Sequence, residues 1–250
     1  EMCDSDWSSD VCSSDLNLKS YDPAFAYELA LIVREGIRRM YEQQENIFYY
    51  LTVYNENYPM PPMPAWDAVA EGVLRGAYCW RRSRGDGPPL QLLASGAIMQ
   101  RAIDAAGRLE DWGFAVQLWS VTSYTELARE AEACERRNRL QAPETPEVPY
   151  VQSLFAEVGG PVVAVTDYLK ALANGVARWM PANYTVLGTD GFGLSETRQQ
   201  LRDHFEISER YIAHACLCAL RRQGALEEPR FRTLCEELGI DPGKADPASR

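Results

Sequence analysis

The chain has 250 residues, and its 25 Lys and Arg against 36 Asp and Glu give a formal net charge of −11 at pH 7. This acidic balance argues against a nucleic-acid partner, which needs clustered basic residues, and no apolar run reaches the roughly eighteen residues of a membrane span. The two histidines, His204 and His214, are too few for a zinc site or a Ser/His/Asp triad to be expected. The cysteines lack the spacing of a disulfide framework, which favours reduced thiols in the cytoplasm.

Residues 1–16 are predicted to be an artefact that does not fold. The peptide DWSSDVCSSDL, Asp6 to Leu16, resembles translated sequencing-adapter DNA, and this composition buries too little apolar surface to fold. The alternative is a natural Ser/Asp-rich disordered tail. Setting the segment aside removes five acidic groups and no basic ones, so the remaining 234 residues carry a net charge of −6. We therefore expect a truncated chain whose upstream part is missing.

The first predicted elements are one helix and one strand. Asp22-Pro23 is a helix-start signal, and apolar residues at helical spacing predict an amphipathic helix over residues 20–41. Residues 47–54, IFYYLTVY, are rich in β-branched and aromatic side chains and predict a strand buried on both faces. The four prolines of residues 55–64 then indicate a domain boundary.

The chain after the boundary repeats a strand-and-helix plan. A short helix is predicted over residues 66–79, strands at 91–94 and 115–119, and helices at 97–109 and 125–137. Ser123 to Glu126 has the pattern of a capping box, and residues 138–149 are predicted to form a loop.

Residues 159–201 predict a βαβ unit. The apolar run 162–165 is a strand, Thr166 or Asp167 starts a helix that ends at Pro181, and residues 184–187 form the next strand. A glycine loop over 188–193 leads to a helix that starts at Ser195, and further helices follow at 208–222 and 229–238. Since such connections are parallel and right-handed, the fold class is α/β, with helices covering a mostly parallel sheet.

Four loops follow the carboxyl ends of the predicted strands, where open α/β sheets commonly bind ligands. They are Ser95-Gly96, Thr122-Ser123, Thr166-Asp167 and Thr189 to Gly193. Helix capping alone also explains the small polar residues in each loop. Glu126 and Asp167 are a candidate acid–base pair, but the capping box already uses Glu126, and neither carboxyl shows a sign of desolvation. These patterns assign no catalytic, cofactor-binding or metal-binding residue.

Long, ordered stretches resemble the C-terminal part of the homodimeric pyruvate dehydrogenase family. They include YDPAFAYELALIVREGIRRMYEQQENIFYYLTVYNENYPMPPMP, WSVTSYTELARE, VVAVTDYLK and YTVLGTDGFGLSETRQQLRDHFE. On that template, residues 17–62 are the helix-and-strand end of a pyrimidine-binding domain, and residues 66–245 form a transketolase-like three-layer αβα C-terminal domain. The chain departs from the family pattern at Leu194, Glu147 and Arg137.

The resemblance implies an enzyme that decarboxylates pyruvate on thiamine diphosphate and Mg²⁺ and passes the acetyl group to lipoyl-lysine. It implies a cytoplasmic homodimer partnered with dihydrolipoyl acetyltransferase. The family's metal, diphosphate and catalytic motifs are expected upstream of Ser20. This fragment is therefore expected to bind no cofactor and to be inactive alone, while the Asp190 to Gly193 turn contributes a dimer contact. The alternative is a free-standing flavodoxin-like binding or scaffolding domain.

Overall fold

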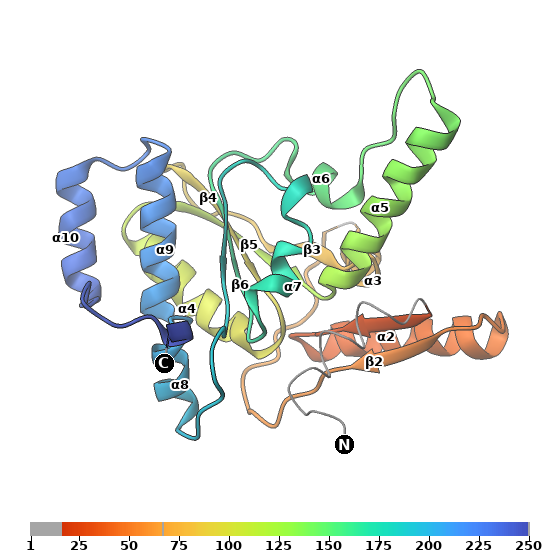
Figure 1. Cartoon of the computed structure of the whole chain (residues 1–250), viewed down its shortest axis with the longest axis horizontal. Helices are drawn as coiled ribbons and strands as arrows, with labels where there is room; N and C mark the ends of the chain where they lie inside the picture. The colour runs from red at the N-terminus through yellow and green to blue at the C-terminus, as the bar shows by residue number, and fades with distance from the viewer. Residues whose placement is uncertain (1–16, 67, 250) are drawn as a thin grey trace.

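The computed structural model describes residues 17–66 and 68–249, and the prediction for residues 1–16 lies outside this part (Figure 1). Its centre is a five-stranded sheet in the order β3-β5-β4-β6-β7. The strands are β3 (Ala77–Arg81), β4 (Pro89–Ala94), β5 (Ala115–Val121), β6 (Val162–Val165) and β7 (Tyr184–Leu187). β4 to β7 pair in parallel, whereas β3 is antiparallel to β5. The predicted α/β class with a mostly parallel sheet is confirmed.

Helices cover both faces of the sheet, which makes three layers (Figure 1). One face packs on α4 (Met99–Asp111) and α9 (Glu209–Arg222), and α10 (Glu228–Leu238) packs against α9. The other packs on α5 (Tyr124–Gln141), α6 (Tyr150–Phe155) and α7 (Lys170–Asn174). Because neighbouring strand residues point to opposite faces, a strand between two helical layers must be apolar throughout, and all four residues of β6 are fully buried.

A smaller βαβ unit, residues 18–51, precedes this domain and forms the front unit of the chain. β1 (Leu18–Tyr21) pairs in parallel with β2 (Phe48–Leu51), and α2 (Ala26–Ile37) and the π-helical turn η1 (Arg38–Glu42) connect them. The predicted helix over 20–41 was therefore wrong at its start, since Ser20 and Tyr21 belong to a strand. The helix begins only where the Glu28 carboxylate accepts from the Ala24 and Phe25 amides.

The front unit also differs from prediction in its burial. β2 alternates between exposed and half-buried residues, and Phe48 is 44% exposed. It was predicted to be buried on both faces, but only one strand pairs with it among the described residues. Strand composition reports β-propensity and not the number of covering layers, which explains the error.

The predicted helix over 66–79 is two elements, α3 (Val69–Arg75) and β3. Gly76 separates them with φ +108°, and a Cβ there would lie 2.5 Å from the Ser123 carbonyl oxygen. Only glycine fits this turn, which redirects the chain into the antiparallel strand.

Other helix boundaries also differ from prediction. α6 lies beyond the predicted loop, and α5 extends to Gln141. The helix predicted from Thr166 begins at Lys170, because Thr166 Oγ1 accepts from the Tyr168 amide and Asp190 Oδ1 from the Lys170 amide. It breaks before η3 (Ala177–Trp179). α8 (Arg198–His204) begins after Thr197 and not at Ser195.

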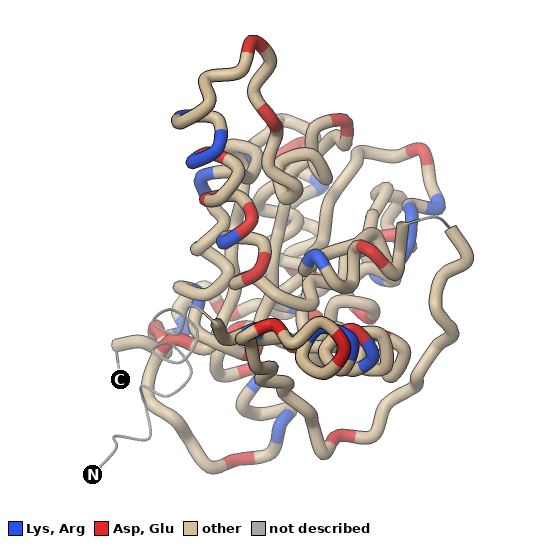
Figure 2. The backbone as a smooth tube through the Cα atoms, turned by 90° about the vertical axis from the view of Figure 1, so that its right-hand side faces the viewer, with Lys and Arg blue, Asp and Glu red and all other residues tan. Residues whose placement is uncertain are grey.

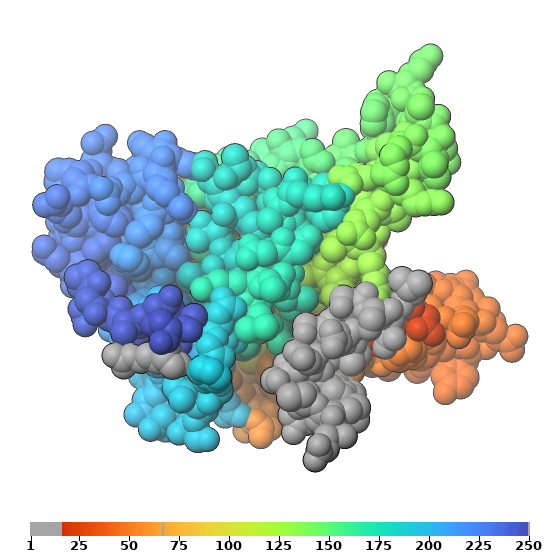
Figure 3. Space-filling view, in the orientation of Figure 1, coloured from red at the N-terminus to blue at the C-terminus, as the bar shows by residue number. Residues whose placement is uncertain are grey.

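Two short 3₁₀ segments, η2 (Gly96–Ile98) and η4 (Pro247–Ser249), complete the secondary structure of the described residues. The far end of α5 and its following loop stand out from the body (Figure 3). Acidic and basic residues are interspersed along the chain (Figure 2). Across residues 17–66 and 68–249, none of the helices combines the length and the hydropathy that crossing a bilayer requires.

Candidate functional site at the carboxyl edge of the sheet

The front unit lies on the edge of the sheet where the parallel strands end. The Asp22 amide donates to the Thr122 carbonyl at 2.7 Å, and the Gly96 amide donates to the Asp22 carbonyl at 3.1 Å. Ser123 Oγ donates to the Ser20 carbonyl at 2.6 Å. Two of the four loops that the sequence offered for a ligand therefore bind the chain's own backbone.

Asp22 is the centre of this contact. Its Oδ1 accepts from Thr52 Oγ1 at 2.6 Å and from the Tyr54 hydroxyl, while the buried Oδ2 has no hydrogen-bond partner among the described residues. Removal from water raises the pKa of this carboxyl. A Cβ on Gly96, which has φ +52°, would lie 2.6 Å from Oδ1. Glycine is therefore favoured at position 96, both by the positive φ and by the closeness of the Asp22 carboxyl.

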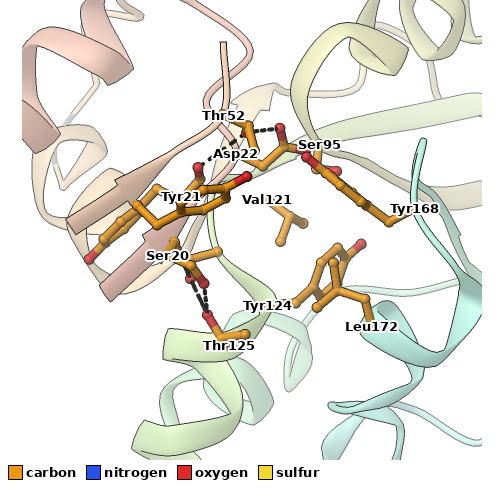
Figure 4. Close-up of a pocket in the computed structure, with 12 residues that line it drawn as sticks. Ser20, Tyr21, Asp22, Thr52, Ser95, Val121, Tyr124, Thr125, Tyr168 and Leu172 are labelled. Carbon is orange, nitrogen blue, oxygen red and sulfur yellow. Dashed lines mark hydrogen bonds between the residues drawn. The ribbon is translucent and has the colours of Figure 1, made fainter. Parts of the chain in front are cut away.

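A small, largely apolar cavity of about 60 Å³ opens beside Asp22 (Figure 4). Figure 4 shows side chains entering it from the front unit, from α5 and from the loop after β6. Its polar lining is made of hydroxyls and one carboxyl, contributed by Ser20, Asp22, Thr52, Ser95, Ser123, Tyr124, Thr125 and Tyr168. This volume accommodates a few water molecules and excludes an organic cofactor.

Glu28 is the second buried carboxyl and is fully enclosed. Oε1 accepts from Ser120 Oγ and from the Tyr78 hydroxyl, both at 2.6 Å, and Oε2 accepts from the Ala24 and Phe25 amides. Burial raises its pKa, and these four donors oppose that shift. The carboxylate therefore joins α2 to β3 and β5 across the predicted domain boundary.

A larger cavity of about 350 Å³ lies beside the remaining candidate loops. Asp167 and the Thr189 to Gly193 turn line it together with Glu56 and Arg202. Burial raises the pKa of Asp167 to about 6, against the opposing charge of Arg202. Gly191 has φ +128°, as expected for this turn, whereas Gly193 does not adopt a positive φ.

The candidate acid–base pair is not supported. Glu126 pairs with Lys19 at 2.6 Å and with Arg129 at 3.1 Å, whereas Asp167 lines the larger cavity. Two details were wrong. Asp167 is desolvated, and Glu126 does not close the capping box, because the Ser123 amide donates to the Gly76 carbonyl. Ser123 Oγ does cap α5 by accepting from the Glu126 amide at 3.1 Å.

Sequence reasoning missed Asp22 and Glu28. Asp22 was read only as a helix-start signal. A signal for Glu28 existed, because it lies on the apolar stripe of α2, three residues after Phe25 and four before Ile32, where a carboxylate must find buried donors. Within the described residues, no three Asp, Glu, His or Cys side chains gather closely enough to hold a metal ion.

Comparison with known proteins defines the class first. Residues 76–208 match the family model of the transketolase-like C-terminal domain, and the chain belongs to this family. Solved transketolases share its fold. The structure from Campylobacter jejuni has a TM-score of 0.57 at 18% identity, covering 85% of this chain and 28% of the other. The Leishmania mexicana transketolase has a TM-score of 0.53 at 18% identity, covering 98% and 29%.

The sequence relatives are more specific. The chain is 44% identical to the pyruvate dehydrogenase E1 component of Escherichia coli over 234 residues and 43% identical to that of Cupriavidus necator over 236. These matches cover 92% and 93% of this chain but 26% of each relative, so the chain spans about a quarter of their length. Residues 2–61 match the model of the pyruvate dehydrogenase E1 component middle domain. The predicted resemblance to the C-terminal part of this enzyme is confirmed.

Proposed function

We propose that the chain acts as the C-terminal part of a pyruvate dehydrogenase E1 component. The complete enzyme decarboxylates pyruvate on thiamine diphosphate with Mg²⁺ and passes the acetyl group to lipoyl-lysine of dihydrolipoyl acetyltransferase. It works in the cytoplasm as a homodimer. The observation that carries this proposal is the identity of 44% over 92% of the chain to one such component.

Within that enzyme this part has a structural role. The front unit fills the strand-end edge where α/β sheets commonly bind ligands, through the Asp22 and Ser123 contacts. Residues 17–62 then end the pyrimidine-binding domain, and residues 66–245 form the C-terminal domain, with the Asp190 to Gly193 turn at the dimer contact. The competing reading is a free-standing flavodoxin-like binding or scaffolding domain.

We place the thiamine diphosphate site outside this chain, because the family's metal and diphosphate motifs are expected upstream of Ser20. The cavity of about 60 Å³ beside Asp22 supports this placement, since it is smaller than that cofactor. We therefore assign no catalytic, cofactor-binding or metal-binding residue here, and we expect the fragment to be inactive alone.

The test is isothermal titration of the chain with thiamine diphosphate and Mg²⁺, followed by a pyruvate-dependent dye-reduction assay. We expect no binding at micromolar concentrations and no saturable rate, with a full-length relative as the positive control. Micromolar binding together with turnover of pyruvate would overturn the structural role. A second arm adds, as a separate chain, the part of the Escherichia coli relative that the match does not cover, and restored activity would support the proposal.

A further inference from the structure

A cavity of about 350 Å³ lies between the front unit and α8, beside the glycine turn that the proposed function places at the dimer contact. One wall is the segment that carries Tyr54 and Glu56, and another is the glycine turn. Much of the lining is apolar, contributed by Ala97, Leu194, Leu201, Phe205 and Ile207. A concave, largely apolar cavity of this size with a few converging polar groups is the usual form of a small-molecule site.

The two arginines that line the cavity, Arg198 and Arg202, differ in how closely they pair with Glu56. Glu56 accepts from Arg202 Nη1 at 3.1 Å and from Nη2 at 2.7 Å, which is a bidentate pair. Arg198 and Arg101 also lower the pKa of Glu56, so three guanidinium groups act on one carboxylate. Arg101 has its own partner in Asp104 at 3.0 Å. Arg198 is therefore the cation with the least compensation.

Arg198 keeps most of its donors free. Its Nε lies 3.8 Å from Glu56 Oε2, which is too far for a hydrogen bond, and among the described residues its one hydrogen-bond acceptor is the neutral Asn55 Oδ1. A guanidinium has five N–H donors in a planar fork that matches a carboxylate. The side chain is 54% exposed, so a ligand can reach it from solvent.

We infer that this cavity is a binding site for a small organic monocarboxylate with an apolar body. The carboxylate binds Arg198, and the body packs on the apolar lining of Leu194, Leu201 and Phe205. A single charge is favoured over a phosphate dianion because Glu56 and Asp167 also line the cavity and would repel a second negative charge. The inference is independent of the proposed enzyme activity.

The test measures binding to the full chain by isothermal titration and saturation-transfer NMR with benzoate, benzyl alcohol and inorganic phosphate. We expect millimolar, one-to-one binding of benzoate, and binding at least about tenfold weaker for the other two, since each lacks one half of the recognised chemistry. No binding of benzoate at 10 mM, on the order of the weakest specific affinities, would overturn the inference. So would inorganic phosphate binding as tightly as benzoate.

Substitutions in the lining test whether benzoate binds in this cavity. Arg198→Gln should weaken benzoate binding about tenfold, and Leu194→Ala should weaken it several-fold. Both side chains are about half exposed, so circular dichroism and the melting temperature should not change. Arg178→Gln is the matched control, because Arg178 is 58% exposed and does not line the cavity. Equal loss in Arg178→Gln, or unchanged binding in Arg198→Gln, contradicts the assignment.

Discussion

Glu28 shows how one buried side chain fixes the relation between the front unit and the sheet. Its carboxylate accepts from the two backbone amides just before α2 and from two hydroxyls on β3 and β5. A buried charge costs desolvation, and only a complete set of donors offsets it. Removing the carboxylate therefore leaves several buried donors without acceptors and a cavity beside them.

We predict that Glu28→Ala lowers the free energy of unfolding by about 3–5 kcal/mol. Glu28→Gln should cost much less, because its amide oxygen can accept from the backbone while its NH₂ group donates to hydroxyls that rotate to accept. Urea unfolding of both variants measures this, with the exposed Glu132→Ala as the control. If the Ala and Gln variants were equally stable, the hydrogen-bond network would not be the cause.

Asp167 gives the stability a specific pH dependence. Burial raises its pKa from 3.8 to about 6, so the folded chain holds a proton there that the unfolded chain has released. The native state binds more protons between about pH 4 and 6, and this contribution to stability is lost as the pH rises through that window. Lowered carboxyl pKa values elsewhere, as at Glu56, act in the opposite direction.

A comparison with Asp167→Asn isolates the effect, because asparagine has no proton to lose. The stability of Asp167→Asn relative to the unchanged chain should rise by about 2–3 kcal/mol from pH 4 to pH 7. Denaturant unfolding at a series of pH values measures the difference. The exposed Asp86→Asn is the control, and a difference that stays constant across this range rules out the assigned burial effect.

At the scale of elements, the apolar runs determined what could be predicted. β4 and β6 were found because strands buried on both faces read as continuous apolar stretches. β1 and β3 were missed because the pairing that defines them joins residues far apart in sequence, such as Ala77 and Val121. The positions of Asp22 and Glu28 depend on that same pairing, so local patterns did not reveal their burial.

The N-cap of α5 also connects two elements, because Ser123 caps the helix and bonds to the backbone of β1. Ser123 Oγ accepts from the Glu126 amide and donates to the Ser20 carbonyl. We predict that Ser123→Ala lowers the free energy of unfolding by about 2 kcal/mol, since it removes both a helix cap and the hydrogen bond to the Ser20 carbonyl.

The control is another helix cap without the second role. Thr197 caps α8 by accepting from the Gln200 amide, in an exposed position. Thr197→Ala should cost about 1 kcal/mol. Thermal unfolding compares the two variants. Equal costs would show that the bond from Ser123 to the front unit contributes nothing beyond the cap.

At the scale of the whole molecule, the front unit and the main sheet share buried side-chain contacts. The front unit covers Ser120 and Thr122, which are fully buried, and packs on Tyr78, which is 3% exposed. Trp80 stacks on Phe25 with ring centroids 5.3 Å apart. The sequence boundary near the prolines therefore separates two units whose buried side chains depend on each other.

We predict that a chain reduced to residues 65–250 is less stable than the full chain, although the reduced chain retains all five strands of the main sheet. Removing the front unit uncovers Tyr78, Trp80 and the hydroxyl groups at the strand ends. Apolar patches of a few hundred Å² drive association. Light scattering and binding of a hydrophobic dye measure the outcome, with the full chain as the reference. A monodisperse reduced chain that melts at or above the temperature of the full chain would show that the contacts of Glu28 and Asp22 add no stability to the domain.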